Sequence, residues 1–340
     1  MTITRRQLGA LALPALAASR AHAKPNSNFG GVQIGAITYS FRSLPVEKTL
    51  QYCLDSGVSA VELMSNVAES YAGAPLPVMR PMGPPPGQRP AGGPGGAPPA
   101  GRPGGPGRFQ ATPEQIEARK KAAAALTAWR TAAPMSKFKE FRKMYEGAGV
   151  KIYCFKLPPT LEMPDAEYDY IWNVAETLGA NHITMELPTS DELLARVSTY
   201  AAKRKLAIAF HTHGQGGASG FDKCLSASPY AMLNFDVGHY FGVNGESPLP
   251  LVEKYAARIS SLHLKDRKAP SPNPNGGPPV GGATVPWGEG GTPMKEILQL
   301  MKRKQYRFPA SIELEYPVPE GSDAVAEVRK CVDYCKAALA

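Results

Sequence analysis

Carboxylates and imidazoles stand at the ends of several short apolar runs in this sequence. The segment NFDVGHYFG, residues 234–242, places Asp236 and His239 three positions apart where such a run ends. Comparable side chains end other runs: Glu186 in NHITMEL, His211 and His213 in LAIAFHTH, His263 in ISSLHLK, and Glu313 and Glu315 in FPASIELEY. If these ends converge in the fold, the carboxylates need a cation, because charged groups are almost never buried without a partner. The residue types therefore indicate a bound metal ion.

Each of these residues by itself has an ordinary explanation. A single glutamate at a strand end, such as Glu186, usually forms an ion pair, and a single histidine such as His182 is usually a surface or capping residue. Four potential ligands on four different runs are harder to explain in that way, and together they predict a shared metal site. The four are Glu186, Asp236, His263 and Glu313.

The runs that carry these residues are short, rich in β-forming residues and repeated along the chain. There are eight of them, at 32–41, 59–64, 150–157, 181–187, 206–213, 231–239, 259–265 and 308–316. Helical patterns lie between them and after the last, at 46–57, 136–149, 167–180, 191–205, 250–258, 292–304 and 323–339. Eight such units, without a glycine-rich phosphate loop after the first strand, favour an α/β fold of the (β/α)₈ TIM-barrel type over an open doubly wound sheet. The carboxyl ends of the strands in a barrel form its active face, which is where the candidate ligands fall.

Two segments stand outside this pattern. Arg5 and Arg6 precede an apolar run and a small-residue A-H-A pattern at 21–23, which predicts a twin-arginine signal peptide over residues 1–23 and a periplasmic mature protein. An amphipathic helix is the weaker alternative, since the run has no polar face. Between Arg80 and Arg108, 20 of 29 residues are Pro or Gly, so we expect this stretch to be a disordered insertion. Together with its flanking segments, the predicted insertion extends over residues 66–134, after the second strand. Without both segments 248 residues remain, a length suited to a barrel.

Charge and cysteine content argue against some classes of function. The formal charge of +9 falls to +6 without the signal peptide, and four of the remaining positive charges lie in the Pro/Gly-rich stretch. We therefore expect no nucleic-acid surface. After the signal no apolar run is long enough to cross a membrane. Five scattered cysteines provide no disulfide framework, and we expect no essential disulfide.

The motifs around the candidate ligands resemble those of the xylose-isomerase-like TIM-barrel superfamily, the sugar phosphate isomerase and epimerase family. They are MELP, FDVGH, LHLKD and IELEY, and the likeness extends over about residues 32 to 340, apart from the insertion. The resemblance implies one metal ion held in order by Glu186, Asp236, His263 and Glu313. It also implies that His239, three positions after the aspartate, contacts the substrate.

One departure from the family pattern concerns the substrate. Keto-sugar epimerases usually carry an arginine six positions after the metal histidine, but position 269 is Ala here, and Lys265 and Arg267 are the nearby cations. The substrate pose of those enzymes therefore does not transfer to this chain. Glu315 also competes with Glu313 for the role of ligand, because residues two apart on a strand point the same way.

The implied ligand set of three carboxylates and one imidazole suits a hard divalent ion, Mn²⁺ first, with Mg²⁺ or Co²⁺ as alternatives. If a ketose bound the metal ion through its carbonyl and the adjacent hydroxyl, the C–H next to the carbonyl would become more acidic. The metal ion would then stabilise the enediolate that forms when this proton is lost. Glu186 and Glu313 are the predicted general acid and base. The predicted substrate contacts are His211, His239, Lys265 and Arg267, although His211 is equally consistent with a histidine that caps the barrel mouth.

Four functions remain open at this point. The first is a metal-dependent isomerase or epimerase of a non-phosphorylated sugar, since sugar phosphates are cytoplasmic and no phosphate loop is present. The second is a 3-keto-glycoside lyase, in which the same enediolate expels the aglycone. An endonuclease-type barrel with three zinc ions needs more histidines than the five after the signal. A non-catalytic sugar-binding barrel would have little use for the metal ligands. The expected partner is thus a small carbohydrate, and nothing in the sequence indicates an oligomeric state.

Overall fold

Parallel strands close into a barrel in the part of the chain that the structure describes. The computed structural model describes residues 24–76, 112–188, 190–213, 217–275 and 277–340. Within these ranges eight parallel strands pair in the order β2-β11-β8-β7-β6-β5-β4-β3, and a further pairing of β2 with β3 closes the sheet. The strands are β2 (Val32–Ile37), β3 (Ala60–Met64), β4 (Lys151–Lys156), β5 (His182–Glu186), β6 (Ala207–His211), β7 (Ala231–Asp236), β8 (Ile259–Leu264) and β11 (Ala310–Ile312). The predicted (β/α)₈ barrel is confirmed.

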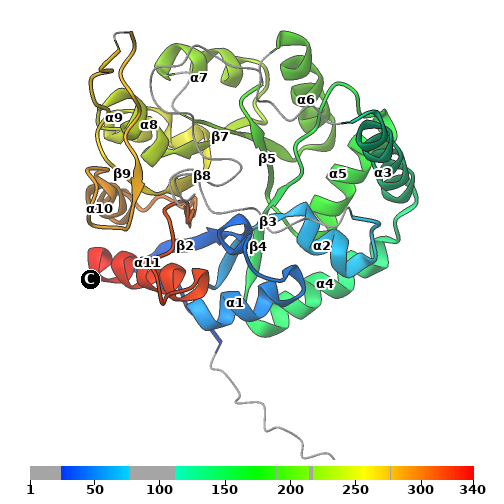
Figure 1. Cartoon of the computed structure of the whole chain (residues 1–340), viewed down its shortest axis with the longest axis horizontal. Helices are drawn as coiled ribbons and strands as arrows, with labels where there is room; N and C mark the ends of the chain where they lie inside the picture. Colours follow the sequence, from blue (N-terminus) through cyan, green and yellow to red (C-terminus); the bar gives the residue numbers. More distant parts are fainter. Residues whose placement is uncertain (1–23, 77–111, 189, 214–216, 276) are drawn as a thin grey trace, which may run out of the picture.

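Helices surround the barrel (Figure 1). They are α1 (Thr49–Ser56), α2 (Ser65–Ala72), α3 (Pro113–Ala132), α4 (Met135–Ala148), α5 (Asp165–Leu178), α6 (Asp191–Arg204), α7 (Gly217–Ser226), α8 (Val237–Asn244), α9 (Leu249–Tyr255), α10 (Met294–Lys304) and α11 (Ala324–Leu339). In α10 the buried residues Met294, Ile297, Leu298 and Met301 follow helical spacing, so one face packs on the strands and the other is solvated. Small antiparallel pairs add β1 (Asn28–Phe29) beside β2, and β9 (Asp266–Arg267) beside β10 (Thr284–Val285).

Three strands are shorter than the sequence patterns suggest, each for a local reason. The run 32–41 ends as a strand at Ile37, and the run 308–316 is a strand only over 310–312. There the Ser40 hydroxyl donates to the Ile312 carbonyl (3.3 Å) and accepts from the Leu314 amide (3.0 Å), replacing ladder hydrogen bonds. The run 231–239 ends as a strand at Asp236, because that carboxylate accepts a bond from the His239 amide (2.6 Å) and caps α8. α7 and α8 are helices that the sequence patterns did not indicate.

The ends of the predicted insertion are helical and fixed to the barrel wall. α2 follows β3 directly, and α3 begins with a capping box in which Thr112 and Gln115 bond each other's backbone. The buried guanidinium of Arg130 in α3 pairs with Glu69 of α2 and Glu167 of α5, each at 2.7 Å. The predicted signal peptide, 1–23, and the Pro/Gly-rich stretch, 80–108, lie outside the described residues.

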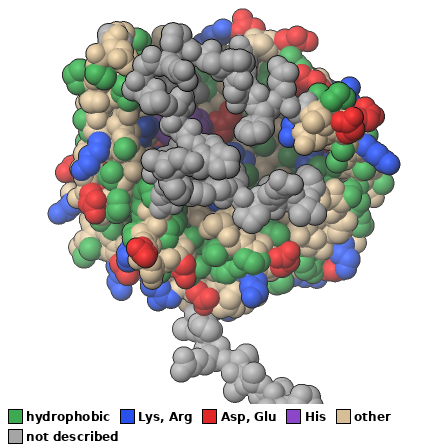
Figure 2. Space-filling model, viewed as in Figure 1, with side chains coloured by type: hydrophobic (Ala, Val, Ile, Leu, Met, Phe, Trp, Pro, Cys, Tyr) green, Lys and Arg blue, Asp and Glu red, His purple; other side chains and the backbone are tan. Residues whose placement is uncertain are grey.

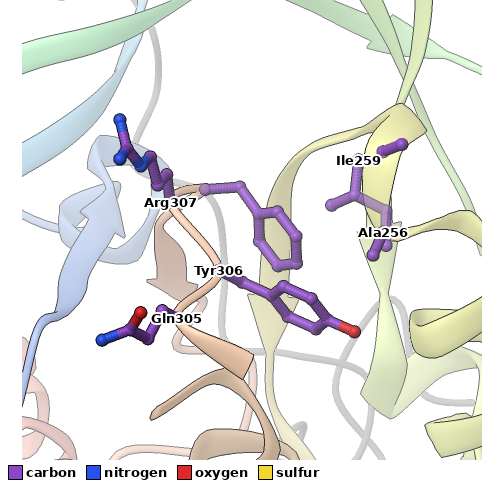
Figure 3. A pocket seen from close by; sticks show the side chains of 7 residues that line it. Ala256, Ile259, Gln305, Tyr306 and Arg307 are labelled. Atoms are coloured by element: carbon purple, nitrogen blue, oxygen red, sulfur yellow. The ribbon is translucent and has the colours of Figure 1, made fainter. Parts of the chain in front are cut away.

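A surface cavity of ≈ 480 Å³ lies at the amino ends of β8 and β11, lined by Ala256, Ala257, Ile259 and residues 305–308 (Figure 3). That face of a TIM barrel serves stability rather than chemistry, and the candidate ligands stand at the other ends of the strands. The five cysteines are buried free thiols. No helix in the described ranges combines the length and apolarity that crossing a bilayer requires.

Candidate active site at the carboxyl ends of the strands

Four buried residues on four strand ends come together at the barrel mouth. They are His211, Asp236, His263 and Glu313, and one potential ligand atom from each lies within 4.8 Å of the others. Three belong to the predicted metal set, and the fourth, His211, was predicted to contact the substrate. Figure 2 shows histidine and acidic side chains near the centre of this face of the molecule. The ends of these strands thus converge in the barrel, as we expected from the sequence.

His263 lies between two carboxylates. Its Nδ1 is 2.7 Å from Glu313 Oε2 and its Nε2 is 2.8 Å from Glu62 Oε2, and all three side chains are buried. Burial opposes charge on the imidazole, but the two carboxylates outweigh it and raise the pKa of His263 to about 10. The same pairing lowers the pKa of Glu62 to about 2 against the effect of burial. His263 is therefore a cation that donates from both nitrogens, which leaves no lone pair for a metal ion in this arrangement.

Lys265 places a second cation among the carboxylates. Its Nζ lies 2.9 Å from Asp236 Oδ2, 2.8 Å from Glu313 Oε2 and 2.7 Å from Glu315 Oε2, and the side chain is fully buried. Burial disfavours the ammonium, but these three carboxylates raise the pKa of Lys265 well above its usual value. Lys265 thus provides part of the positive charge that, from the sequence, we expected a metal ion alone to provide. Glu313 and Glu315 both reach this ammonium, as their spacing predicted.

Glu62 organises the interior of the site and was not singled out from the sequence. Besides His263, it accepts hydrogen bonds from the Thr184 hydroxyl (2.7 Å) and the Asn234 amide (3.0 Å). The Asn234 oxygen then faces His211 Nδ1 at 2.7 Å, so His211 carries its proton on Nδ1 and a lone pair on Nε2. Burial, followed by nearby cations, lowers the pKa of His211 to about 4, which keeps it neutral at pH 7. The signal that identifies Glu62 is a carboxylate inside the apolar run SAVELM.

The predicted ligand Glu186 lies apart from this group. Its side chain is half exposed at the rim and pairs with His213 (2.8 Å) and with the buried Lys156 (3.2 Å). Burial opposes ionisation, but these partners lower the pKa of Glu186 to about 2. The ion pair matches the ordinary explanation for a lone glutamate, and Lys156 is a buried cation that the sequence patterns did not reveal. The role of Glu186 as a ligand stays a prediction.

The predicted substrate contacts occupy different depths. Lys265 is buried among carboxylates, and His211 belongs to the ligand group. Arg267 Nη1 contacts His239 Nδ1 at 2.8 Å, and His239 Nε2 lies 3.4 Å from Glu315 Oε2. Outside the site, His182 is buried and hydrogen-bonded to Ser261 (3.1 Å), so it is a capped residue but not a surface one. The sequence could not show that His182 is buried on β5, because a single histidine at the start of an apolar run gives no information about its surroundings.

The residues present fit a divalent cation. Oδ2 of Asp236 is buried and lies 2.9 Å from Lys265 Nζ and 3.9 Å from His211 Nε2. Four ionised carboxylates, those of Glu62, Asp236, Glu313 and Glu315, lie close together here, with the cations His263 and Lys265 between them. A lone pair on His211 Nε2 beside clustered, ionised carboxylates is the kind of donor set that holds a divalent cation.

Comparisons with known proteins agree with the fold. The family model described as "Xylose isomerase-like TIM barrel" matches residues 114–335. A xylose isomerase domain protein from Planctomyces limnophilus is 16% identical, with a TM-score of 0.57 over 90% of this chain and 97% of that one. A sugar phosphate isomerase/epimerase from Parabacteroides distasonis is 17% identical, with a TM-score of 0.53 over 96% and 99%. D-psicose 3-epimerase, solved with D-fructose, is 10% identical, with a TM-score of 0.52 over 90% and 99%. No significant match was found among curated proteins.

Proposed function

Because the chain belongs to the xylose isomerase-like TIM-barrel family, we propose that it is a divalent-metal-dependent isomerase or epimerase of a non-phosphorylated sugar. The observation that carries the proposal is the buried group of His211, Asp236, His263 and Glu313 at the barrel mouth. The structural neighbours include a D-psicose 3-epimerase and a sugar phosphate isomerase/epimerase, whose chemistry is proton transfer next to a sugar carbonyl. The proposed twin-arginine export favours a sugar without phosphate.

Three groups would hold the metal ion: His211 through its open Nε2, Asp236 through Oδ2, and Glu313. Mn²⁺ is the proposed ion, because carboxylates make up most of the set. When bound, a divalent ion polarises a carbonyl and stabilises negative charge on its oxygen. His263 is the fourth member of the group. In its present arrangement it holds Glu62 and Glu313 in place as an imidazolium.

The proton transfer itself is assigned to carboxylates of this chain. Glu313 is the proposed base: it is ionised, buried and in short contact with His263 and Lys265. Glu186 is the proposed partner that returns the proton from the rim, where it is half exposed and ionised. Lys265 holds Glu313 and Glu315 in a fixed orientation, so the base does not swing away from the reacting carbon.

Solvent deuterium incorporation tests the proposal. Free ketoses and 3-keto-glycosides are incubated in D₂O with the protein and Mn²⁺, and the products are followed by NMR. Epimerisation places deuterium on the carbon that changes configuration, whereas elimination releases the aglycone and identifies a lyase. An Asp236→Ala variant should lose the exchange while the barrel stays folded.

Metal analysis of the purified protein separates the remaining classes. One divalent ion per chain supports the proposal. Three zinc ions would support an endonuclease-type site, and a sugar that binds without metal or exchange would support a binding protein. Absence of exchange with every substrate in the panel, together with absence of metal, would refute the proposed function.

A further inference from the structure

Arg267 and His239 meet at the rim of the site, where β9 lies against α8. The Nη1 atom of Arg267 is 2.8 Å from Nδ1 of His239. A guanidinium has only donors, so Nδ1 must accept and must carry the lone pair of a neutral imidazole. The single proton of the neutral ring is then on Nε2.

The guanidinium is held so that it cannot turn away from the imidazole. Its Nε and Nη2 both donate to the Gly282 carbonyl, at 2.9 and 2.5 Å, and the Gly282 amide donates to the Gly242 carbonyl at 2.8 Å. A Cβ at position 242 would lie 2.5 Å from Arg267 Nε, and a Cβ at position 282 would lie 1.7 Å from the Lys268 carbonyl oxygen. The backbones of Gly242 and Gly282 therefore pack so closely against Arg267 and Lys268 that neither position has room for a side chain.

The other nitrogen of His239 is left open. Nε2 is buried, forms no hydrogen bond with the described residues, and lies 3.4 Å from Glu315 Oε2, which already accepts from Lys265 at 2.7 Å. An unsatisfied buried donor costs free energy until a partner arrives. The geometry therefore leaves this donor available to an oxygen of a ligand.

We propose that Arg267 is a positioning residue that fixes His239 as the Nε2–H tautomer, so that His239 donates a hydrogen bond to a carbonyl or hydroxyl oxygen of the substrate. The donation to a sugar rests on the proposed function, but the tautomer does not. Arg267 acts on the substrate through the imidazole.

The same geometry decides against a second metal site. His211, His213 and His239 form another group of potential ligands at the mouth. A neutral imidazole ligates through a nitrogen without a proton, and the only such nitrogen of His239 is the one that Arg267 occupies. With His239 excluded, two imidazoles remain, which is too few for the multi-zinc arrangement of an endonuclease-type barrel.

Nitrogen-15 NMR of the full chain, labelled at histidine, tests the tautomer directly. Long-range ¹H–¹⁵N correlations report which ring nitrogen carries the proton, and the His239→Gln spectrum assigns the signals. In the parent protein we expect His239 to show a protonated Nε2 and an unprotonated Nδ1. Arg267→Met should lose this separation through tautomer exchange, whereas Arg267→Lys, which keeps a donor, should retain it. Arg204→Met, which removes an arginine from the outer face of α6, is the control and should leave the His239 signals unchanged.

Two results would overturn the inference. One is a parent spectrum with the proton of His239 on Nδ1. The other is a shift of the His239 Nε2 signal into the metal-bound range when Zn²⁺ alone is added. Neither measurement depends on turnover, so a correct tautomer combined with absence of both exchange and metal would refute the proposed function and leave the role of Arg267 intact.

Discussion

The buried ammonium of Lys265 offers the sharpest test of how the site is held together. Lys265→Met keeps a long side chain of similar shape but removes a charge that lies within 2.9 Å of Asp236, Glu313 and Glu315. Removing one partner of a buried ion pair costs about 3–5 kcal/mol, because the other charge is left without compensation. Here three carboxylates lose that partner, so we expect a loss at the upper end of this range.

Added metal should restore much of that loss. In the variant the carboxylates keep the cation site but lack the competing ammonium, so they should bind Mn²⁺ more tightly than the parent protein does. Binding to the folded state alone stabilises by about 2.7 kcal/mol at 100 times Kd. Urea unfolding at pH 7, with EDTA and with Mn²⁺, measures both effects.

Lys156→Met is the matched control for this experiment. Lys156 is also a buried lysine, but its close ion pair is with the half-exposed Glu186, and the buried Glu62 and Glu313 attract it from further away. We expect this variant to lose less stability than Lys265→Met, because water solvates its close partner, and to respond less to Mn²⁺. If Lys265→Met unfolds at the same urea concentration as the parent protein in EDTA, the ammonium does not hold the carboxylates, and the charge argument for the site fails.

Three further predictions concern the base, the packing around Lys265 and the Pro/Gly-rich stretch. Glu313→Gln should reduce deuterium exchange by about 10²–10⁴-fold, while Glu315→Gln should be milder, since only Glu313 also bonds His263; the reverse order would move the base to Glu315. Gly238→Ala should cost about 1–3 kcal/mol in urea unfolding, because its Cβ would lie 2.3 Å from Lys265 Cγ; Gly147→Ala on exposed α4, with open space around its Cβ, should cost nothing. Deleting residues 80–108 should leave stability and exchange nearly unchanged, since loop length changes closure entropy slowly; loss of exchange in a folded barrel would show that the segment takes part in function.

The sequence by itself determined the barrel and the end of it that does chemistry. Strand runs with buried faces and helices with one apolar stripe are local patterns, and eight repeats of the pair leave few ways to bury them all. Because the strands are parallel, a polar residue at the carboxyl end of any run falls on the same face. Asp236, His263 and Glu313 could therefore be placed at one site without knowledge of any contact.

Contacts across the barrel were decided only by the tertiary structure. Glu62 and His263 are 201 positions apart, and their bond depends on how the closed sheet staggers β3 against β8. Glu186 turns outward to Lys156 and His213, while His211 turns inward to Asn234, although both end neighbouring strands. Side-chain directions at strand ends follow the nearest charges and donors, and no local pattern encodes those neighbours.

The identity of the internal cations has the same origin. The sequence showed that several carboxylates would need positive charge, and a metal ion was the cation that residue types alone could suggest. Closure of the barrel buries Lys265 among three of those carboxylates and protonates His263 between two, so the chain itself supplies positive charge inside the site. A lysine in an apolar run is ambiguous by sequence, because its long side chain can reach solvent or fold inward, and only the packed neighbours decide between the two.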